Sequence, residues 1–275
     1  MFAIYVNDMP EGISSYISLF ADDAKLLRKV YCKEDCVVLQ KDLDKINEWS
    51  QKWEMEFNSS KCKIMEFGKS KYRPRQVYTM GNNIVEKTNE EKDLGVNIMD
   101  NLSPEKHVNR ITAETYNLLR NIKVAFTYVD EEMIKKLVIA LIRPRLEYAA
   151  TVWSPSTKKH IRKLEMIQRA ATKLPQSLRD LTYEERLCIL GLTTLEQRRE
   201  RGDLIMIYRV MKGMERLDRE DLVNWDIRDT RGHGKKLKRD NCRREIKKTQ
   251  LSSKMHRNLE QSRQGNCTSR NNSRL

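Results

Sequence analysis

The stretch YISLFADDAKLL, residues 16–27, places two adjacent carboxylates, Asp22 and Asp23, in the middle of an apolar segment. Apolar residues cluster on both sides of the pair and Asp tolerates turn conformations, so we expect two short strands joined at ADD as a hairpin. Most Asp pairs of this kind are exposed turn residues or helix caps. Two carboxylates at a tight turn also suit divalent cations, because Mg²⁺ takes few protein carboxylates and completes its shell with water and substrate phosphates. This stretch alone leaves both interpretations open.

The segment after the hairpin has the period of a helix with one buried face. Apolar residues recur every three or four positions, at Leu39, Leu43, Ile46, Trp49, Trp53 and Phe57. KCKIMEFG, residues 61–68, then alternates like a strand, and short extended pieces follow in QVYTM (76–80), NIVEK (83–87) and KDLGVNI (92–98). Because these strands are mostly adjacent in sequence, we expect an α+β region with mostly antiparallel pairing.

After Ser103-Pro104 the pattern becomes helical. One apolar stripe runs over residues 108–122, a second helix over 131–148 has Asp130 as its N-cap and Pro144 as its end or kink, and a third stripe covers 161–171. Two weaker helices are expected near 183–190 and 195–214. From Arg231 onward no apolar period remains, which predicts a largely disordered tail.

Composition narrows the classes of partner. The chain has 39% apolar residues and a net charge of +14, so a polyanion is favoured as partner, with nucleic acid ahead of a membrane surface. Residues 231–275 hold 14 Lys+Arg against 3 Asp+Glu, which fits a solvated tail as well as a nucleic-acid arm.

Targeting and metal-binding signals are weak outside the Asp pair. The six cysteines include no C-x-x-C pair and the histidines do not lie at zinc-ligand spacing near them, which favours reduced thiols and no structural zinc. The longest apolar run, residues 137–142, is too short for a membrane span, and the apolar start lacks the basic region of a signal peptide. We therefore expect an intracellular protein, in the nucleus or cytoplasm.

Several motifs in order resemble a known enzyme family. FADD, residues 20–23, resembles the [FY]-x-D-D signature of reverse transcriptases, and residues 4–26 look like the segment running into that signature in non-LTR retrotransposon polymerases of the jockey and CR1 type. The next family motif, N-x-x-K, falls on Asn58 and Lys61, and KDLGVNI matches the following Leu-Gly element. Residues 142–155, 163–173 and 178–205 resemble the helical region that these elements encode after the palm.

This resemblance implies a two-metal nucleotidyl transfer with RNA template, DNA primer and two Mg²⁺ ions. Asp22 would bind the catalytic metals, and Asp23 would be a weaker second ligand. Phe20 would lie near the growing primer end. Lys61 would lie near the leaving pyrophosphate, where it donates a proton or neutralises charge. An exposed lysine at the start of a strand explains Lys61 equally well.

The resemblance also implies contacts with nucleic acid. Leu94 and Gly95 would belong to a turn that grips the primer strand, although a simple strand and turn explains them too. The later helices would act as a thumb along the duplex, with their apolar stripes in the core. The charged residues that are candidates for phosphate contacts are Lys158, Lys159, Arg162, Lys163 and Arg169.

The full expectation is an α+β protein with a partial reverse transcriptase palm (1–103), a helical thumb-like region (104–230) and a basic, disordered tail (231–275). The fingers, the strand with the other metal-binding Asp and the Gly-rich element lie before IYVNDMP in the family. We therefore expect a polymerase remnant that is inactive alone. The alternatives are a non-catalytic nucleic-acid-binding protein that uses basic helical faces and the tail, and a chain that makes no stable protein.

Overall fold

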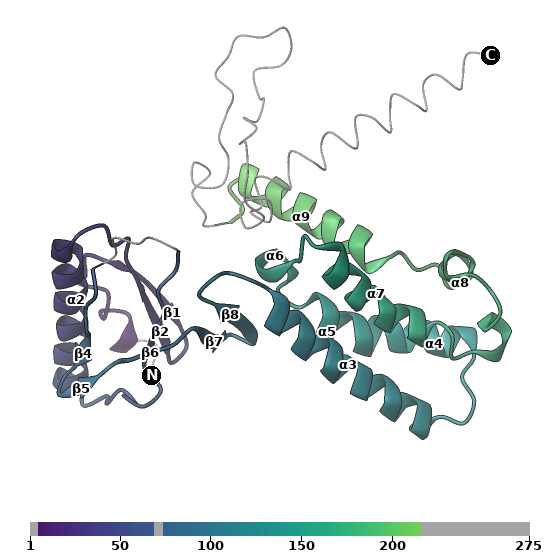
Figure 1. Ribbon diagram of the computed structural model, residues 1–275, viewed down its shortest axis with the longest axis horizontal. Coiled ribbons are helices and arrows are strands. Elements are labelled where there is room, and N and C mark those ends of the chain that lie inside the picture. Colours follow the sequence, from purple (N-terminus) through teal and green to yellow (C-terminus); the bar gives the residue numbers. More distant parts are fainter. Residues whose placement is uncertain (1–4, 69–73, 216–275) are drawn as a thin grey trace, which may run out of the picture. The chain divides into compact units, whose positions relative to one another are not determined.

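The computed structural model describes residues 5–68 and 74–215, and the predicted basic tail lies outside these residues. The chain divides into two compact units, Met1–Glu91 with Met99–Asn101 and Lys92–Ile98 with Leu102–Leu275. The first unit contains one long helix and short strands, and the second is built mainly from helices (Figure 1). The predicted α+β class is confirmed. The palm, thumb and tail assignments stay predictions.

Within residues 5–68 and 74–215 the strands form four two-stranded ladders instead of one sheet. The strands are β1 (Tyr16–Phe20), β2 (Asp23–Leu27), β3 (Lys63–Ile64), β4 (Thr79–Met80), β5 (Asn83–Ile84), β6 (Glu86–Lys87), β7 (Glu90–Asp93) and β8 (Val96–Met99). The β1–β2 and β4–β5 hairpins are antiparallel, as expected, and β7 pairs with β8. The β3–β6 ladder departs from the expectation, because β3 pairs in parallel with a strand from beyond the next hairpin. Within the predicted strand over 61–68, the observed strand β3 is limited to Lys63–Ile64.

The long helix α2 spans Lys33–Lys52 and ends earlier than the apolar stripe predicted. Glu54 takes a left-handed conformation (φ 53°), its N–H bonds the Gln51 carbonyl, and the Met55 N–H bonds the Ser50 carbonyl at 3.0 Å. This is the hydrogen-bond pattern of a Schellman C-cap. The extension of the helix to Phe57 was therefore wrong, because Trp53 and Phe57 lie beyond the helix.

The second unit packs helices around one apolar core. The elements are α3 (Glu105–Ala125), α4 (Glu131–Leu137), η1 (Val138–Ile142), α5 (Arg143–Glu147), α6 (Ala150–Trp153), α7 (Lys158–Ala171), η2 (Gln176–Leu178), α8 (Tyr183–Leu190) and α9 (Leu195–Met211). In Figure 1, α7 lies beside α3 and α9, and these pairs are in contact. The core includes Val108, Ile134, Leu146 and Leu164, each with no exposed surface. The predicted stripes of α3 and α7 therefore face the core.

Asp130 is the N-cap of α4, as predicted: its carboxylate accepts a hydrogen bond from the Met133 N–H at 2.7 Å. Pro144 does not end the helix. A π-helical turn, η1, precedes it, and the Arg143 N–H reaches back five residues to the Val138 carbonyl. Proline lacks an N–H and its ring clashes with the carbonyl four residues earlier, and a π-helical turn is one way to relieve this within a continuing helix.

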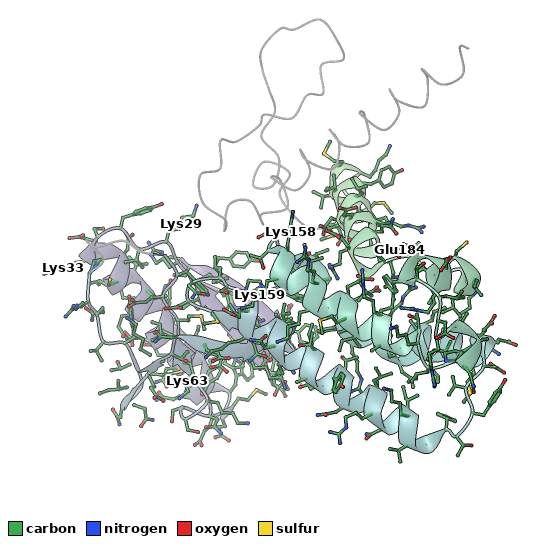
Figure 2. The ribbon with its side chains drawn as sticks, turned by 45° about the vertical axis from the view of Figure 1, so that its right-hand side comes forward. Lys29, Lys33, Lys63, Lys158, Lys159 and Glu184 are labelled. Atoms are coloured by element: carbon green, nitrogen blue, oxygen red, sulfur yellow. The ribbon has the colours of Figure 1, made fainter. Side chains whose placement is uncertain are left out.

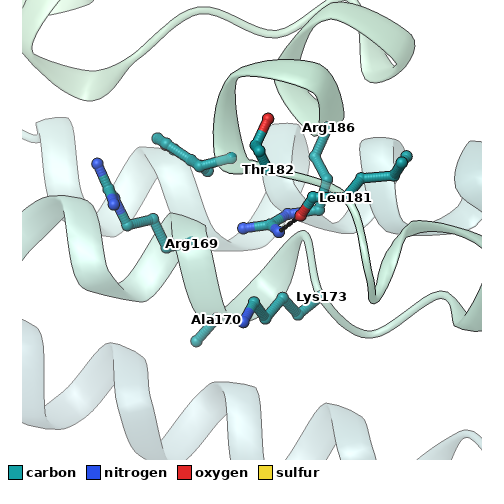
Figure 3. A pocket seen from close by; sticks show the side chains of 7 residues that line it. Arg169, Ala170, Lys173, Leu181, Thr182 and Arg186 are labelled. Carbon is teal, nitrogen blue, oxygen red and sulfur yellow. Dashed lines mark hydrogen bonds between the residues drawn. The ribbon is translucent and has the colours of Figure 1, made fainter.

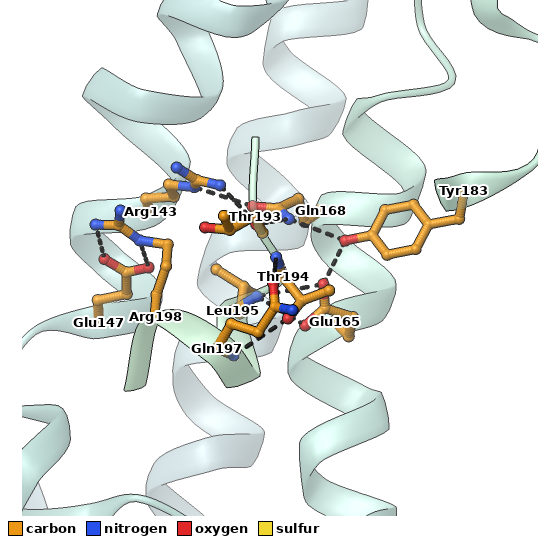
Figure 4. A network of polar contacts seen from close by, with 10 residues as sticks. All are labelled: Arg143, Glu147, Glu165, Gln168, Tyr183, Thr193, Thr194, Leu195, Gln197 and Arg198. Carbon is orange, nitrogen blue, oxygen red and sulfur yellow. Dashed lines mark hydrogen bonds and ion pairs between the residues drawn. The ribbon is translucent and has the colours of Figure 1, made fainter. Parts of the chain in front are cut away.

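A buried polar network joins α5, α7, α8 and the start of α9 (Figure 4). The Gln168 side chain, fully buried, accepts from Arg143 Nε (3.0 Å) and donates to the Tyr183 hydroxyl (2.9 Å) and the Thr193 carbonyl (3.1 Å). The Tyr183 hydroxyl donates to Glu165, which also accepts from the Leu195 N–H at 3.0 Å. These charge-assisted bonds satisfy polar groups that would be costly to bury alone.

Candidate metal centre and nucleic-acid interface

The two aspartates lie at the tip of the β1–β2 hairpin. Phe20 pairs with Asp23, which leaves Ala21 and Asp22 as a two-residue turn. Ala21 has a positive φ (52°) and Asp22 does not, the pattern of a type II′ turn that matches the twist of the flanking strands. Both carboxylates are exposed. The predicted hairpin is confirmed, and it presents two adjacent carboxylates to solvent.

The face of the hairpin that carries Asp23 is exposed and of mixed polarity. Cross-strand partners share a face and alternate residues of a strand return to it, so this face holds Tyr16, Phe20 and Leu27 together with Ser18, Asp23 and Lys25. Tyr16 is 68% and Phe20 60% exposed. Within the described ranges this ladder has only its two strands, so each has an outer edge without a β-partner. Such a hairpin is marginal alone, which favours a further partner for this face and these edges.

A small pocket of about 130 Å³ lies at the hairpin tip, lined by Asp22, Asp23, Trp49, Glu56 and Phe57 among others. The Trp49 indole donates to Asp8 at 2.7 Å. No group of three or more His, Cys, Asp or Glu side chains in the described residues is arranged to hold a metal ion. The Asp pair offers the oxygen ligands that hard divalent cations take, and other groups would have to supply the rest of the shell.

Asp42 anchors the hairpin and was missed by sequence reasoning. Its buried carboxylate accepts from the Ser14 N–H (3.0 Å), the Ser15 N–H (2.8 Å) and the Ser15 hydroxyl (2.6 Å), directly before β1. Burial alone would raise the pKa of Asp42, but these bonds outweigh it and hold the pKa below its usual value. The sequence contained one signal that Asp42 is buried: it lies on the apolar face of the helix, three residues after Leu39 and four before Ile46.

Lys61 lies in a turn after α2 and not at the start of a strand. Its N–H donates to the Asn58 carbonyl at 3.0 Å, so the two motif residues close one turn. The Asn58 side chain accepts from the Ser60 hydroxyl at 2.6 Å. The Lys61 side chain is exposed. The turn thus fixes the backbone from Asn58 to Lys61, while the Lys61 side chain remains accessible to solvent.

Leu94 and Gly95 form the two-residue turn between β7 and β8. Both have positive φ (43° and 84°), as in a type I′ turn, which is unfavourable for leucine. Tyr148 donates its hydroxyl to the Leu94 carbonyl (3.0 Å), and Arg110 Nη2 donates to the Gly95 carbonyl (2.5 Å). Both turn carbonyls are thus bound within the second unit, while the Leu94 side chain is 38% exposed.

The five basic residues of α7 do not form one open face. Lys158 and Lys159 lie near the start of the helix (Figure 2). Lys159 Nζ lies 3.5 Å from Glu105, and Lys163 donates to the Asn109 side chain, so both contact α3. Within the described chain, Lys158 and Arg162 are exposed and have no such partner. The fifth residue, Arg169, stacks on the Tyr183 ring with its guanidinium carbon 4.4 Å from the ring centroid.

The chain is similar in sequence to two curated polymerases. The chain is 26% identical over 185 residues to the RNA-directed DNA polymerase from mobile element jockey of Drosophila funebris. It is 27% identical over 187 residues to the probable RNA-directed DNA polymerase from transposon X-element of Drosophila melanogaster. The chain is similar to the polymerases of non-LTR retrotransposons. The family resemblance predicted from the motifs is confirmed.

The similarity covers 61% and 63% of this chain but only 20% of each polymerase, so the chain spans about a fifth of their length. No protein-family model matches the chain, and no solved structure is significantly similar to it.

Among the helices of residues 5–68 and 74–215, none is both long and apolar enough to cross a membrane. The candidate residues are divided between the two compact units. The first unit contains Asp22, Asp23, Phe20 and Lys61, and the second contains Leu94, Gly95 and the basic residues of α7.

Proposed function

We propose that this chain is part of an RNA-directed DNA polymerase of a jockey-type non-LTR retrotransposon. The observation that carries the proposal is the exposed Asp22–Asp23 pair at the tip of a two-residue hairpin turn, in a chain similar to two such polymerases. RNA template and DNA primer are the partners of this proposed activity. The first unit then corresponds to part of the palm, and the helical second unit to the region that follows it.

In this proposal Asp22 and Asp23 hold divalent metal, with Mg²⁺ as the physiological ion. Two bound ions would activate the attacking oxygen and stabilise the leaving one in nucleotidyl transfer. The hairpin tip suits this role because exposed carboxylates leave coordination positions for water and phosphate oxygens. Phe20, on the same face as Asp23, offers an aromatic surface to the primer end. Lys61 offers an exposed cation to the leaving pyrophosphate.

Two carboxylates leave most of the coordination shell of a metal pair to other groups. We infer that a further carboxylate on a strand paired with the free edge of β1 or β2 completes the site in the whole polymerase. The 275-residue chain by itself then does not extend a primer. A second candidate function, nucleic-acid binding without catalysis, is favoured by the exposed Lys158 and Arg162 on α7.

A segment exchange tests the proposed function. The segment of the jockey polymerase that corresponds to residues 5–215 is replaced by these residues, and extension of a DNA primer on an RNA template is measured. We expect the chimera to extend the primer, and Asp22→Ala to lower its rate at least about a hundredfold, because the ligand stabilises transition-state charge through the metal. The matched control is Asp44→Ala, which removes an exposed carboxylate of α2.

One outcome contradicts the proposed function, and another contradicts only the inference that the chain is inactive alone. A chimera that binds the primer–template but extends nothing, with or without Asp22, supports the non-catalytic alternative. Primer extension by the purified 275-residue chain, abolished by Asp22→Ala, would overturn the inference that the chain is inactive alone.

A further inference from the structure

An open pocket of about 360 Å³ lies in the second unit between the end of α7 and the start of α8 (Figure 3). Its lining includes three cationic side chains, Arg169, Lys173 and Arg186, together with Thr182 and Tyr183. No carboxylate lines this pocket. Arg169 is one of the five α7 cations predicted to contact phosphate, whereas neither the predicted metal site nor the turn at Leu94 and Gly95 contributes to the pocket.

Arg186 is the buried cation of the pocket, with 2% of its surface exposed. Its Nε donates to the Thr172 hydroxyl at 3.1 Å, and Nη1 donates to the Leu181 carbonyl at 2.5 Å (Figure 3). In the described part of the chain Nη2 has no hydrogen-bond partner and Arg186 forms no ion pair. A buried guanidinium without a counter-charge is costly, and a bound anion would offset that cost.

The other two cations line the same pocket as Arg186. Arg169 stacks on the Tyr183 ring at 4.4 Å, and the Arg186 guanidinium lies 5.6 Å from the centroid of the same ring. Lys173 is exposed at the end of α7 and makes no ion pair among the described residues. Cation–π contacts position the guanidinium groups without neutralising them. The pocket therefore keeps three positive charges.

Two of the carboxylates near the lining residues, Glu165 and Glu185, have hydrogen-bond partners, and Asp180 and Glu184 are exposed next to the lining residues Leu181 and Tyr183. Glu165 accepts from the Tyr183 hydroxyl and the Leu195 N–H. Glu185 accepts from the Thr182 N–H and hydroxyl, both at 2.7 Å, in the capping box of α8. The positive end of α8 adds to the field of the cations. The lining itself carries three cations and no carboxylate, and this composition favours an anion in the pocket.

We propose that this pocket binds a phosphate group. Arginine pairs well with phosphate oxygens because its planar donors match their geometry, and Nη2 of Arg186 is the donor left to do so. Arg169 and Lys173 would complete the contacts from the rim. The phosphate belongs either to a nucleic-acid strand or to a free nucleotide. The inference rests on the pocket alone and stands independently of the polymerase activity proposed above.

The test is isothermal titration of the full 275-residue chain with inorganic phosphate at constant ionic strength. We expect saturable binding whose affinity falls about tenfold or more in Arg169→Gln/Lys173→Gln, since two charged contacts are lost. The matched control, Arg120→Gln/Lys123→Gln, removes the same charges from exposed positions of α3 and is expected to leave the affinity within about twofold. Equal losses in both double variants, or no saturable binding, would overturn the proposal.

The source of the phosphate is decided with two further probes on the same variants. If phosphate competes with a short single-stranded RNA, and RNA affinity falls only in the pocket variant, the ligand is a backbone phosphate. If a nucleoside monophosphate loses affinity while RNA binding is unchanged, the ligand is a free nucleotide. Either result supports a phosphate site, whereas unchanged affinity for both probes in the pocket variant contradicts it.

Discussion

Replacing Gln168 with Leu is expected to lower the free energy of unfolding of the second unit by about 3 kcal/mol. The amide is fully buried and makes three hydrogen bonds, to Arg143, Tyr183 and Thr193. Leucine has nearly the same volume, so the loss comes from the three missing hydrogen bonds and not from a cavity; Arg143 Nε loses its partner, while Thr193 keeps Arg143 Nη2 and Tyr183 keeps Glu165. The measurement is urea unfolding followed by circular dichroism and tryptophan fluorescence.

The matched control for this prediction is Gln176→Leu, which makes the same change at an exposed position of η2. We expect the control to change the free energy of unfolding by no more than about 0.5 kcal/mol. Equal destabilisation by both substitutions, or none by Gln168→Leu, would show that the network in Figure 4 does not hold α7 to the start of α9.

The second unit is also expected to lose stability as the pH falls from about 6.5 to about 4. His107 is 2% exposed, its Nδ1 accepts the Asn97 N–H at 3.2 Å, and its ring lies 4.8 Å from that of Trp153. Burial, with the nearby Arg110, lowers the pKa of His107 from 6.5 to about 4. Between these pH values His107 binds a proton in the unfolded chain but not in the folded chain. The free energy of unfolding therefore falls by roughly 3 kcal/mol in total.

His107→Gln isolates this contribution, because the amide oxygen keeps an acceptor for Asn97 and does not titrate. We expect the variant to show a shallower fall in unfolding free energy between pH 6.5 and 4 than the parent chain. The carboxylates titrate alike in both chains, so the difference between the two slopes reports His107. Identical slopes would contradict a neutral, buried imidazole at this position.

Local patterns predicted most elements of the fold. The stripes of α3 and α7, the Asp130 cap and the Asp22–Asp23 hairpin follow from spacing and residue type, which act within a few residues. The end of α2 was missed because the residue in the left-handed cap position is Glu54, where glycine is the usual signal. The parallel β3–β6 ladder joins segments more than twenty residues apart, and no local pattern encodes that pairing.

The sequence predicted candidate residues that are exposed and adjacent to one another. It did not predict candidate residues whose role depends on being buried in the folded protein. Asp22 and Asp23 stand out as a charge pair in an apolar stretch. From the sequence alone, Arg186 looks like an ordinary surface arginine of a helix. Tertiary packing makes it a buried hydrogen-bond donor. Lys159 and Lys163 were predicted to meet phosphates, but α3 places Glu105 and Asn109 beside them.

Metal binding by the hairpin at Asp22 and Asp23 is tested by titrating the ¹⁵N-labelled 275-residue chain with Mn²⁺ and following amide line broadening. We expect the signals of residues 21–24 to broaden first, because a paramagnetic ion held by the two carboxylates lies closest to these amides. This selective broadening should vanish in Asp22→Asn/Asp23→Asn and persist in Glu131→Gln/Glu132→Gln, a matched adjacent pair at the start of α4. Broadening that begins elsewhere, or that survives loss of both aspartates, would show that the hairpin does not hold the metal through Asp22 and Asp23.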